Sequence, residues 1–263
     1  MVISMSRDIW SSDQYQRYAD HRGRPFFDLL SAVRVREPRL VVDLGCGPGN
    51  LTATLAARWP GAAVVGVDSS RDMLAATLRH AQPPSLTFVE ADLRQWVPEW
   101  PVDLIVANAV LQWLPDHRAL LPRLVGQLAP GGWFAFQVPG NMSSPSHEIL
   151  REVCSLPAWR ERVGHLLRPD WIAAPEEYLS DLVGLGCAAD VWETTYVQVL
   201  TGEDPVLEWV KGSALRPVLD ALDGEDRDTL LAIYRDRLRE AYPARPWGTV
   251  FPFRRVFAVA QRV

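Results

Sequence analysis

A short glycine-rich stretch is the part of the sequence whose residue types and spacing best suit ligand binding. The apolar run VVDL over 41–44 is followed directly by GCGPGN over 45–50. Glycine adopts positive φ angles and allows close approach to the main chain, so Gly45, Gly47 and Gly49 predict a ligand-binding turn after a strand. Their spacing differs from the G-x-G-x-x-G of dinucleotide-binding loops, and Asp43 would repel a pyrophosphate. The loop therefore favours a ligand without phosphate groups.

Polar side chains end the apolar runs that follow this loop. The run VVGVD ends in Asp68, 23 residues after Gly45, where a ribose-binding carboxylate belongs in a sheet of this kind. The segment LTFVEAD ends in Asp92 beside Leu93, which offers an acceptor for an exocyclic amine and an apolar surface for a purine. A further run, VDLIVAN, ends in Asn108. Together these residues indicate a cationic nucleoside, and S-adenosylmethionine fits that description.

These side chains require a scaffold that brings several strand ends together. Between residues 40 and 138, short apolar runs alternate with amphipathic stretches over 51–58, 70–80 and 117–128. Continuous apolar runs are typical of strands buried on both faces, and their alternation with helices predicts a doubly wound, parallel α/β sheet.

After Pro139 the pattern changes to short helical segments interrupted by prolines. Later in the chain we expect a strand over 189–200, helices over 205–222 and 225–241, and a last strand over 250–263. The two strands are placed together at the edge of the same sheet, which makes it mostly parallel with an antiparallel edge strand. We predict one domain over 1–263. Its parts are an N-terminal helical cover (1–36), a cofactor-binding core (37–139), a helical insertion (140–186), an edge strand (187–200), a helical lid (201–246) and a final strand (247–263).

Composition narrows the class of protein. The 263 residues include 27 basic and 32 acidic side chains, and 48% are hydrophobic, as in ordinary globular proteins. The net charge of −5 and the lack of a Lys/Arg run argue against a nucleic-acid partner. No apolar stretch suits a signal peptide or a membrane span, so we expect a cytoplasmic protein without a membrane partner. Cys46, Cys154 and Cys187 are too widely spaced to indicate disulfides or a metal site.

The motifs occur in the order found in class I S-adenosylmethionine-dependent methyltransferases, and the chain resembles that superfamily. The matching segments are VVDLGCGPGN, GVDSS, FVEADLRQW, the strand through Asn108, and APGG. The resemblance implies a Rossmann-like methyltransferase sheet, with Met73 and Leu93 on the two faces of the adenine and Asp92 at its amine. The cofactor-binding residues expected on this basis are Gly45, Cys46, Gly47, Asp68, Ser69, Met73, Asp92, Leu93 and Asn108.

Segments outside the cofactor motifs are similar to the trans-aconitate 2-methyltransferase family over nearly the whole chain. They include DQY at 13–15, ANAVLQWLPDH at 107–117, QVPGN at 137–141, WETTY at 192–196 and FPFRRVF at 251–257. The resemblance implies a small polycarboxylate, trans-aconitate, as the partner that receives the methyl group.

Arginine is the residue type that best suits a polycarboxylate, because its guanidinium can bind a carboxylate through two hydrogen bonds. Arg216 in the predicted lid, Arg254 or Arg255 on the last strand, and Arg24 near the N-terminus are the candidates. Alternation along a strand turns one of Arg254 and Arg255 inward, and we favour Arg254. The remaining acceptor contacts are expected to be hydrogen bonds from Tyr15, Gln112 and Tyr196.

A carboxylate acceptor simplifies the chemistry. Its unperturbed pKa of about 4 leaves it ionised at neutral pH, so in-line methyl transfer requires orientation but no general base. No catalytic acid or base is therefore predicted. The alternatives are a methyltransferase of the same fold that acts on another small carboxylic acid or a hydroxyl, and a non-catalytic nucleoside-binding protein. A nicotinamide oxidoreductase is disfavoured by the glycine spacing and by Asp43.

Overall fold

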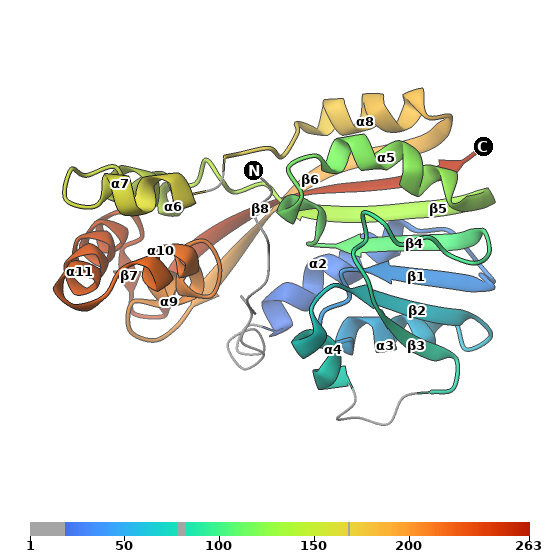
Figure 1. Cartoon of the computed structure of the whole chain (residues 1–263), viewed down its shortest axis with the longest axis horizontal. Coiled ribbons are helices and arrows are strands. Elements are labelled where there is room, and N and C mark those ends of the chain that lie inside the picture. The colour runs from blue at the N-terminus through green and yellow to red at the C-terminus, as the bar shows by residue number, and fades with distance from the viewer. Residues whose placement is uncertain (1–18, 78–82, 168) are drawn as a thin grey trace. The chain divides into compact units, whose positions relative to one another are not determined.

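The computed structural model describes residues 19–77, 83–167 and 169–263 (Figure 1). Contacts divide the chain into two compact units. Unit 1 comprises Met1–Pro139, Ile172–Thr194 and Val256–Val263, and unit 2 comprises Gly140–Trp171 and Thr195–Arg255.

A mostly parallel, mixed sheet of eight strands runs through the described residues, in the order β3-β2-β1-β4-β5-β8-β6, with β7 paired to β8. The order reverses between β1 and β4, which confirms the predicted doubly wound sheet. Strands β8 and β6 are neighbours at one edge, as predicted. The strands are β1 Leu40–Leu44, β2 Ala63–Asp68, β3 Leu86–Glu90, β4 Val102–Asn108, β5 Leu128–Pro139, β6 Cys187–Leu200, β7 Ala244–Arg245 and β8 Gly248–Arg262.

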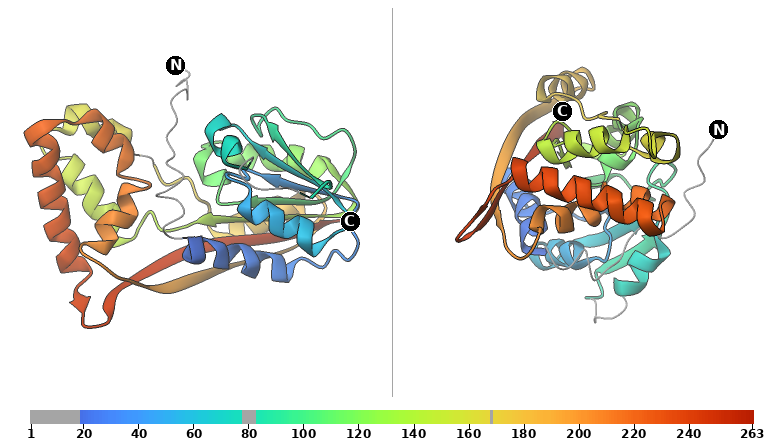
Figure 2. Two further views of the ribbon diagram at one scale, coloured as in Figure 1. Left: turned by 90° about the horizontal axis from the view of Figure 1, so that it is seen from below. Right: turned by 90° about the vertical axis from the view of Figure 1, so that its left-hand side faces the viewer.

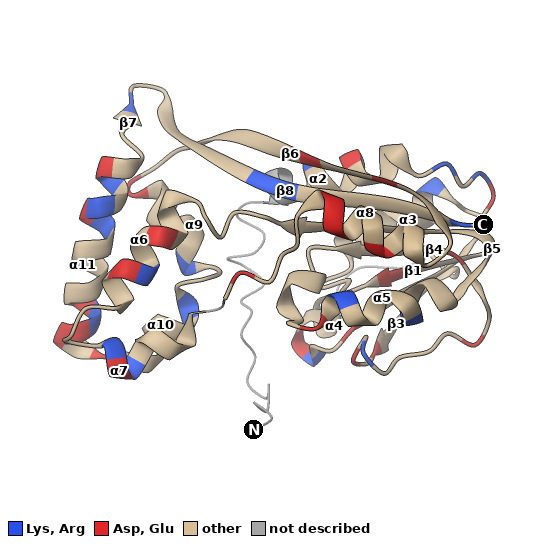
Figure 3. Ribbon diagram, turned by 90° about the horizontal axis from the view of Figure 1, so that it is seen from above, with Lys and Arg blue, Asp and Glu red and all other residues tan. Residues whose placement is uncertain are grey.

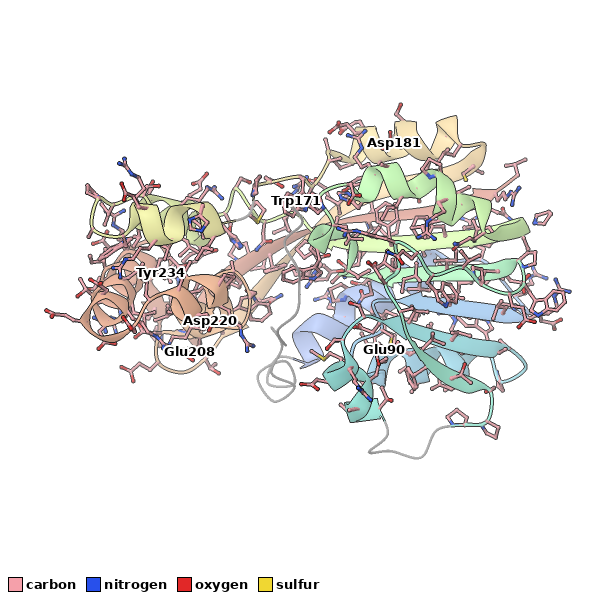
Figure 4. All side chains as sticks on the ribbon, in the orientation of Figure 1. Glu90, Trp171, Asp181, Glu208, Asp220 and Tyr234 are labelled. Carbon is pink, nitrogen blue, oxygen red and sulfur yellow. The ribbon has the colours of Figure 1, made fainter. Side chains whose placement is uncertain are left out.

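Parallel pairing aligns the carboxyl ends of the first four strands. Asp43 of β1 pairs with Gly66 of β2 and with Val106 of β4. Asp68 of β2 pairs with Glu90, the last residue of β3, which is labelled in Figure 4. The acids that the sequence places at strand ends therefore share one edge of the sheet.

The middle of the sheet is apolar on both faces, as continuous apolar runs predict. Leu104, Ile105, Val106 and Ala107 follow one another in β4, and all four are fully buried. Helix α3 packs against β2 and helix α5 against β5, on opposite faces of the sheet (Figure 2). The helices of unit 1 are α2 Ala19–Ala32, α3 Asn50–Arg58, α4 Arg71–Thr77, α5 His117–Gly126 and α8 Pro175–Gly184, with a 3₁₀ turn η1 at Leu111–Trp113.

Unit 2 is mainly helical and has its own buried polar contacts. The Tyr234 hydroxyl donates to the Ser146 carbonyl at 2.8 Å, and the Ser146 amide donates to the Tyr242 hydroxyl at 3.1 Å. Basic and acidic side chains are interspersed on its helices (Figure 3). None of the helices in the described part of the chain is long and apolar enough to cross a bilayer. The helices of unit 2 are α6 Pro145–Cys154, α7 Arg160–Val163, α9 Pro205–Lys211, α10 Arg216–Ala221 and α11 Gly224–Ala241, with a 3₁₀ turn η2 at Gly164–Leu166.

The predicted single helix over 205–222 is wrong, because two helices, α9 and α10, occupy this stretch. Gly212 follows the last residue of α9, and Pro217 lies in the first turn of α10. A proline inside a continuous helix lacks the N–H that would bond to the residue four positions earlier, and its ring collides with that carbonyl. Pro217 instead lies in the first turn of a new helix, where its N–H would have no helical partner in any case.

A buried chain of hydrogen bonds joins α5 to α8 in unit 1. His117 and Tyr178 are both fully buried, and the His117 Nε2 lies 2.7 Å from the Tyr178 hydroxyl. The His117 Nδ1 lies 3.0 Å from the Leu114 carbonyl, which can only accept, so Nδ1 carries the proton and Nε2 accepts from Tyr178. The Ala173 amide donates to the same hydroxyl at 3.3 Å. Burial lowers the pKa of His117, which favours the neutral ring that this arrangement requires.

We predict that Tyr178→Phe lowers the free energy of unfolding by about 1–3 kcal/mol, because the ring packing stays while two buried groups lose their partner. Denaturant unfolding monitored by circular dichroism measures the change. Leu179→Ala, at an exposed position of the same helix, should change it by less than about 0.5 kcal/mol. Equal effects of the two substitutions would show that the hydroxyl contributes nothing.

Candidate active site

The glycine loop after β1 has the backbone that its spacing predicts. Gly45, Gly47 and Gly49 have φ angles of 70°, 56° and 76°, in the region that favours glycine. The amides of Gly45 and Cys46 donate to the Val67 carbonyl of β2 at 2.7 and 3.1 Å. The loop is therefore anchored to the neighbouring strand at the edge where the acids lie.

The three glycines differ in what surrounds them. A methyl group on Gly45 would collide with the side chain of Val110, and one on Gly49 would lie 2.6 Å from the ring of Phe88. A methyl group on Gly47 would meet nothing within 4 Å. Two glycines thus permit close packing inside the protein, whereas the space beside Gly47 is open.

Asp68 connects the glycine loop to the next helix. Its Oδ2 accepts from the Gly47 amide at 2.8 Å, and its Oδ1 accepts from the Ser70 amide at 2.8 Å. The Ser70 hydroxyl in turn accepts from the Met73 amide at 3.3 Å. Hydrogen bonds therefore bring together Gly47, Asp68 and Met73, three of the residues predicted to bind the cofactor, and Ser69 lies between them in the chain.

Asp43 is a buried acid under the glycine loop, with 3% of its surface exposed. Its Oδ2 accepts from the Thr52 hydroxyl of α3 at 2.7 Å. Burial raises the pKa of Asp43 to about 7, and the nearby Asp68 carboxylate adds to this rise. Burial likewise raises the pKa of Cys46, which leaves that side chain a neutral thiol.

The next strand ends hold the other residues predicted to bind the cofactor. Asp92 is exposed, and its Oδ1 accepts from the Arg94 amide at 2.9 Å. Leu93 is part of the hydrophobic core of unit 1. The Asn108 Oδ1 accepts from the Gln137 side-chain amide at 2.7 Å. Eight of the nine predicted cofactor residues therefore lie at or just after the carboxyl ends of β1 to β4 in unit 1, and Met73 lies in the helix that follows β2. Their roles stay predictions.

The turn after β4 is strained next to the glycine loop. Ala109 has a φ of 54°, unusual for a residue with a Cβ, and its amide donates to the Gln137 carbonyl at 3.0 Å. Val110, which follows it, occupies the space beside Gly45. The Gln112 side-chain amide donates to the Ala109 carbonyl at 2.6 Å. Gln112, which is predicted to bind the methyl acceptor, is thus held close to the edge where the predicted cofactor residues lie.

Arg24 is the other residue described in unit 1 that is predicted to bind the methyl acceptor. Its side chain is 73% exposed and forms an ion pair with Asp28 at 3.7 Å. Tyr15 lies outside the described residues.

Unit 2 contains the remaining acceptor candidates. Tyr196 is buried, and Arg216 is partly exposed, with its Nε 4.0 Å from Asp220. Arg254 donates from Nη1 to the Gly140 carbonyl at 3.0 Å. Arg255 is the more buried of the two neighbours, and its guanidinium lies 4.8 Å from the ring centre of Phe253. The two arginines thus differ in burial and in contacts, and the choice of Arg254 for the acceptor stays a prediction.

Two residues that bond to side chains singled out in the sequence were not themselves predicted to belong to the site. Thr52 binds Asp43 from the first turn of α3, and a hydroxyl nine residues after a strand-end acid is a weak signal. Gln137 binds Asn108 from the parallel neighbour β5, and only the strand register reveals this pairing. Among the described residues, no three side chains of the metal-binding types gather at one point.

The reversed strand order, the glycine loop and the carboxylates at the strand ends define a Rossmann-like methyltransferase. Residues 41–132 match the family model described as a methyltransferase domain. The phosphoethanolamine N-methyltransferase 2 of Haemonchus contortus, solved with phosphomonomethylethanolamine and S-adenosylhomocysteine, superposes with a TM-score of 0.54 at 17% identity, over 91% of this chain and 53% of that one.

Sequence comparison identifies the particular family. The chain is 54% identical to the trans-aconitate 2-methyltransferase of Streptomyces avermitilis, over 96% of this chain and 97% of that protein. It is 52% identical to the enzyme of the same name from Streptomyces coelicolor, over 96% of this chain and 86% of that protein. The chain belongs to the trans-aconitate 2-methyltransferase family.

We predict that Gly45→Ala destabilises the protein more than Gly47→Ala. Both variants place an alanine at positive φ, which costs about 1–2 kcal/mol, but only Gly45→Ala also forces Val110 to move. Thermal unfolding of the two variants gives the comparison directly. A larger loss of stability in Gly47→Ala would contradict the open space beside that residue.

The raised pKa of Asp43 predicts a specific pH dependence of stability. The folded-state pKa of about 7 lies above the ordinary 3.8. The contribution of the Asp43 carboxyl to the free energy of unfolding is therefore fully present below about pH 3.8 and is lost as the pH rises through about 7. Asp43→Asn does not titrate, so its stability relative to the wild type should improve by on the order of 1 kcal/mol per pH unit between about pH 5 and 7. Denaturant unfolding over pH 5–8 measures this difference, and parallel stability curves would refute it.

Proposed function

We propose that the chain transfers the methyl group of S-adenosylmethionine to a carboxylate of trans-aconitate and forms its monomethyl ester. The observation that carries the proposal is the 54% identity to a trans-aconitate 2-methyltransferase over 96% of the chain, which extends well beyond the methyltransferase domain at 41–132. S-adenosylmethionine supplies an electrophilic methyl group on a sulfonium. The chain itself must therefore bind and orient the cofactor and the acceptor and exclude water from between them.

The residues at the sheet edge fit this cofactor. The space beside Gly47 is open, so a ligand can approach the loop main chain there. Each carboxylate oxygen of Asp68 accepts one backbone N–H, which leaves a further lone pair on each for a ribose hydroxyl. The acids Asp43 and Asp68 also favour a cationic ligand over a phosphate.

The proposed cofactor contacts follow from this fit. Asp68 accepts from the ribose hydroxyls, Asp92 accepts from the adenine amine, and Met73 and Leu93 contact the adenine ring. The loop at Gly45–Gly47 approaches the ribose and the methionine part, and Ser69 and Asn108 complete the edge.

The acceptor is proposed to be held by arginines. Arg24, Arg216 and Arg254 would orient the carboxylates that do not react, through charge-assisted hydrogen bonds. The remaining contacts are hydrogen bonds from Tyr15, Gln112 and Tyr196. The reacting carboxylate is ionised at neutral pH, so the chain need only hold it in line with the methyl group, away from water. Esterification removes one negative charge from the product, which weakens its attraction to the arginines.

The rest of the predicted setting belongs to the same proposal. Residues 201–246 are proposed as a lid and residues 140–186 as a helical cover within one domain. The partner is a small polycarboxylate rather than a nucleic acid or a membrane, and the proposed location is the cytoplasm.

The direct test is mass spectrometry of trans-aconitate after incubation with the protein and S-adenosylmethionine. We expect the mass to increase by one methyl group, and fragmentation to place this group on a carboxylate. Other small carboxylic acids and phenols serve as competing acceptors in the same assay. Methylation of a phenol with none of trans-aconitate would overturn the proposed acceptor.

Two variants separate the cofactor from the acceptor. Asp68→Ala should raise the KM for S-adenosylmethionine about tenfold or more, and Arg216→Ala should do the same to the KM for trans-aconitate, because each removes charge-assisted hydrogen bonds. Arg227→Ala, at an exposed position of α11, is the control for a lost arginine. Equal changes in both KM values for either of the first two variants would contradict its assigned role.

A further inference from the structure

The segment that follows β3 is a tight turn whose amides are satisfied from within. The Asp92 Oδ1 accepts from the Arg94 amide, and the Asp92 carbonyl accepts from the amides of Gln95 and Trp96 at 2.9 Å each. We call residues 92–96 the adenine turn, because it carries Asp92 and Leu93. Its internal bonds leave the carbonyls of Leu93 and Trp96 to be satisfied from elsewhere.

Helix α5 supplies the partners for both carbonyls. The Arg123 Nη1 donates to the Trp96 carbonyl at 2.8 Å, and its Nη2 donates to the Leu93 carbonyl. The Gln127 side-chain amide adds a weaker bond to the Trp96 carbonyl at 3.2 Å. Because the guanidinium is planar and rigid, one side chain fixes the separation of two points of the adenine turn.

A second contact joins the adenine turn to the start of the same helix. Arg94 lies 3.5 Å from Asp116, the residue before α5. This pair is well exposed and contributes little energy by itself. Arg123 is therefore the principal connection between the adenine turn and α5.

Both outer nitrogens of the Arg123 guanidinium bond to the adenine turn. Within the described part of the chain, its Nε is buried and has no hydrogen-bond partner. Burying a donor without a partner costs free energy, which offsets part of what the two bonds to the carbonyls contribute.

We infer that Arg123 is a positioning residue for recognition of the base: it holds the adenine turn so that Asp92 and Leu93 meet the adenine. The inference rests on the proposed function, in which Asp92 accepts from the exocyclic amine. One Asp92 oxygen is fixed by the Arg94 amide, which leaves the other for the amine. A small displacement of such a group weakens binding and, above all, discrimination between bases.

The test compares two ligands that differ at the base. S-adenosylhomocysteine carries the exocyclic amine, whereas S-inosylhomocysteine has a carbonyl oxygen there, which Asp92 would repel. Isothermal titration calorimetry of the wild type should show a preference for the adenosyl ligand of about tenfold or more. In Arg123→Gln the affinity for S-adenosylhomocysteine should fall about tenfold, and the preference should shrink toward one.

The matched control is Arg118→Gln on the same helix. Arg118 pairs with Glu177 and Asp181 of α8 rather than with the adenine turn. Asp181 is labelled on α8 in Figure 4. This variant should keep both the affinity and the preference of the wild type. In steady-state assays, Arg123→Gln should raise the KM for S-adenosylmethionine while kcat at saturation and the KM for trans-aconitate change by less than about twofold.

Arg123→Lys provides a second variant should Arg123→Gln not fold. Lysine keeps the charge but lacks the planar fork, so its preference should lie between those of the wild type and Arg123→Gln. An unchanged preference in a folded Arg123 variant, or an equal loss of affinity for both ligands, would overturn the inference about Arg123 and leave the proposed function standing. Failure of the wild type to bind S-adenosylhomocysteine would instead overturn the proposed function.

Discussion

The carboxylate of Asp68 is the interaction on which the candidate site depends. One of its oxygens holds the Gly47 amide of the glycine loop and the other holds the Ser70 amide before α4, so two loops from different strands share one anion. Hydrogen bonds to a carboxylate are stronger than those between neutral groups, which suits loops with little apolar surface of their own. Parallel pairing of β2 with β1 and β3 then sets the positions of the neighbouring strand ends.

The acids at this edge also suit the proposed cofactor. Asp43 is buried beneath the loop, and burial disfavours its charged form and raises its pKa to about 7. With Asp68 nearby, this edge disfavours a pyrophosphate and favours a positive sulfur. The negative charge that suits the cofactor does not suit a polycarboxylate, so acceptor binding is proposed for three arginines, two of which belong to unit 2.

Features encoded in local sequence could be predicted, and contacts across the fold could not. Glycine spacing, the strand-end acids and the doubly wound order follow from short patterns, because φ preferences and apolar periodicity act over a few residues. The single helix expected over 205–222 divides into α9 and α10, with Pro217 in the first turn of the second. His117 bonds to Tyr178, 61 residues later in the chain, and Arg123 bonds to Leu93, 30 residues earlier. Local periodicity carries no information about contacts at such separations.

The division of the chain has an evolutionary consequence. The family model for a methyltransferase domain spans only residues 41–132, which fall inside unit 1 and include every proposed cofactor contact. Three of the proposed acceptor contacts, Tyr196, Arg216 and Arg254, arise from unit 2, which the model does not cover. Mutation in unit 2 can therefore alter half of the proposed acceptor contacts and leave every proposed cofactor contact intact, whereas the other half, Tyr15, Arg24 and Gln112, belongs to the same unit as the methyl-donor site.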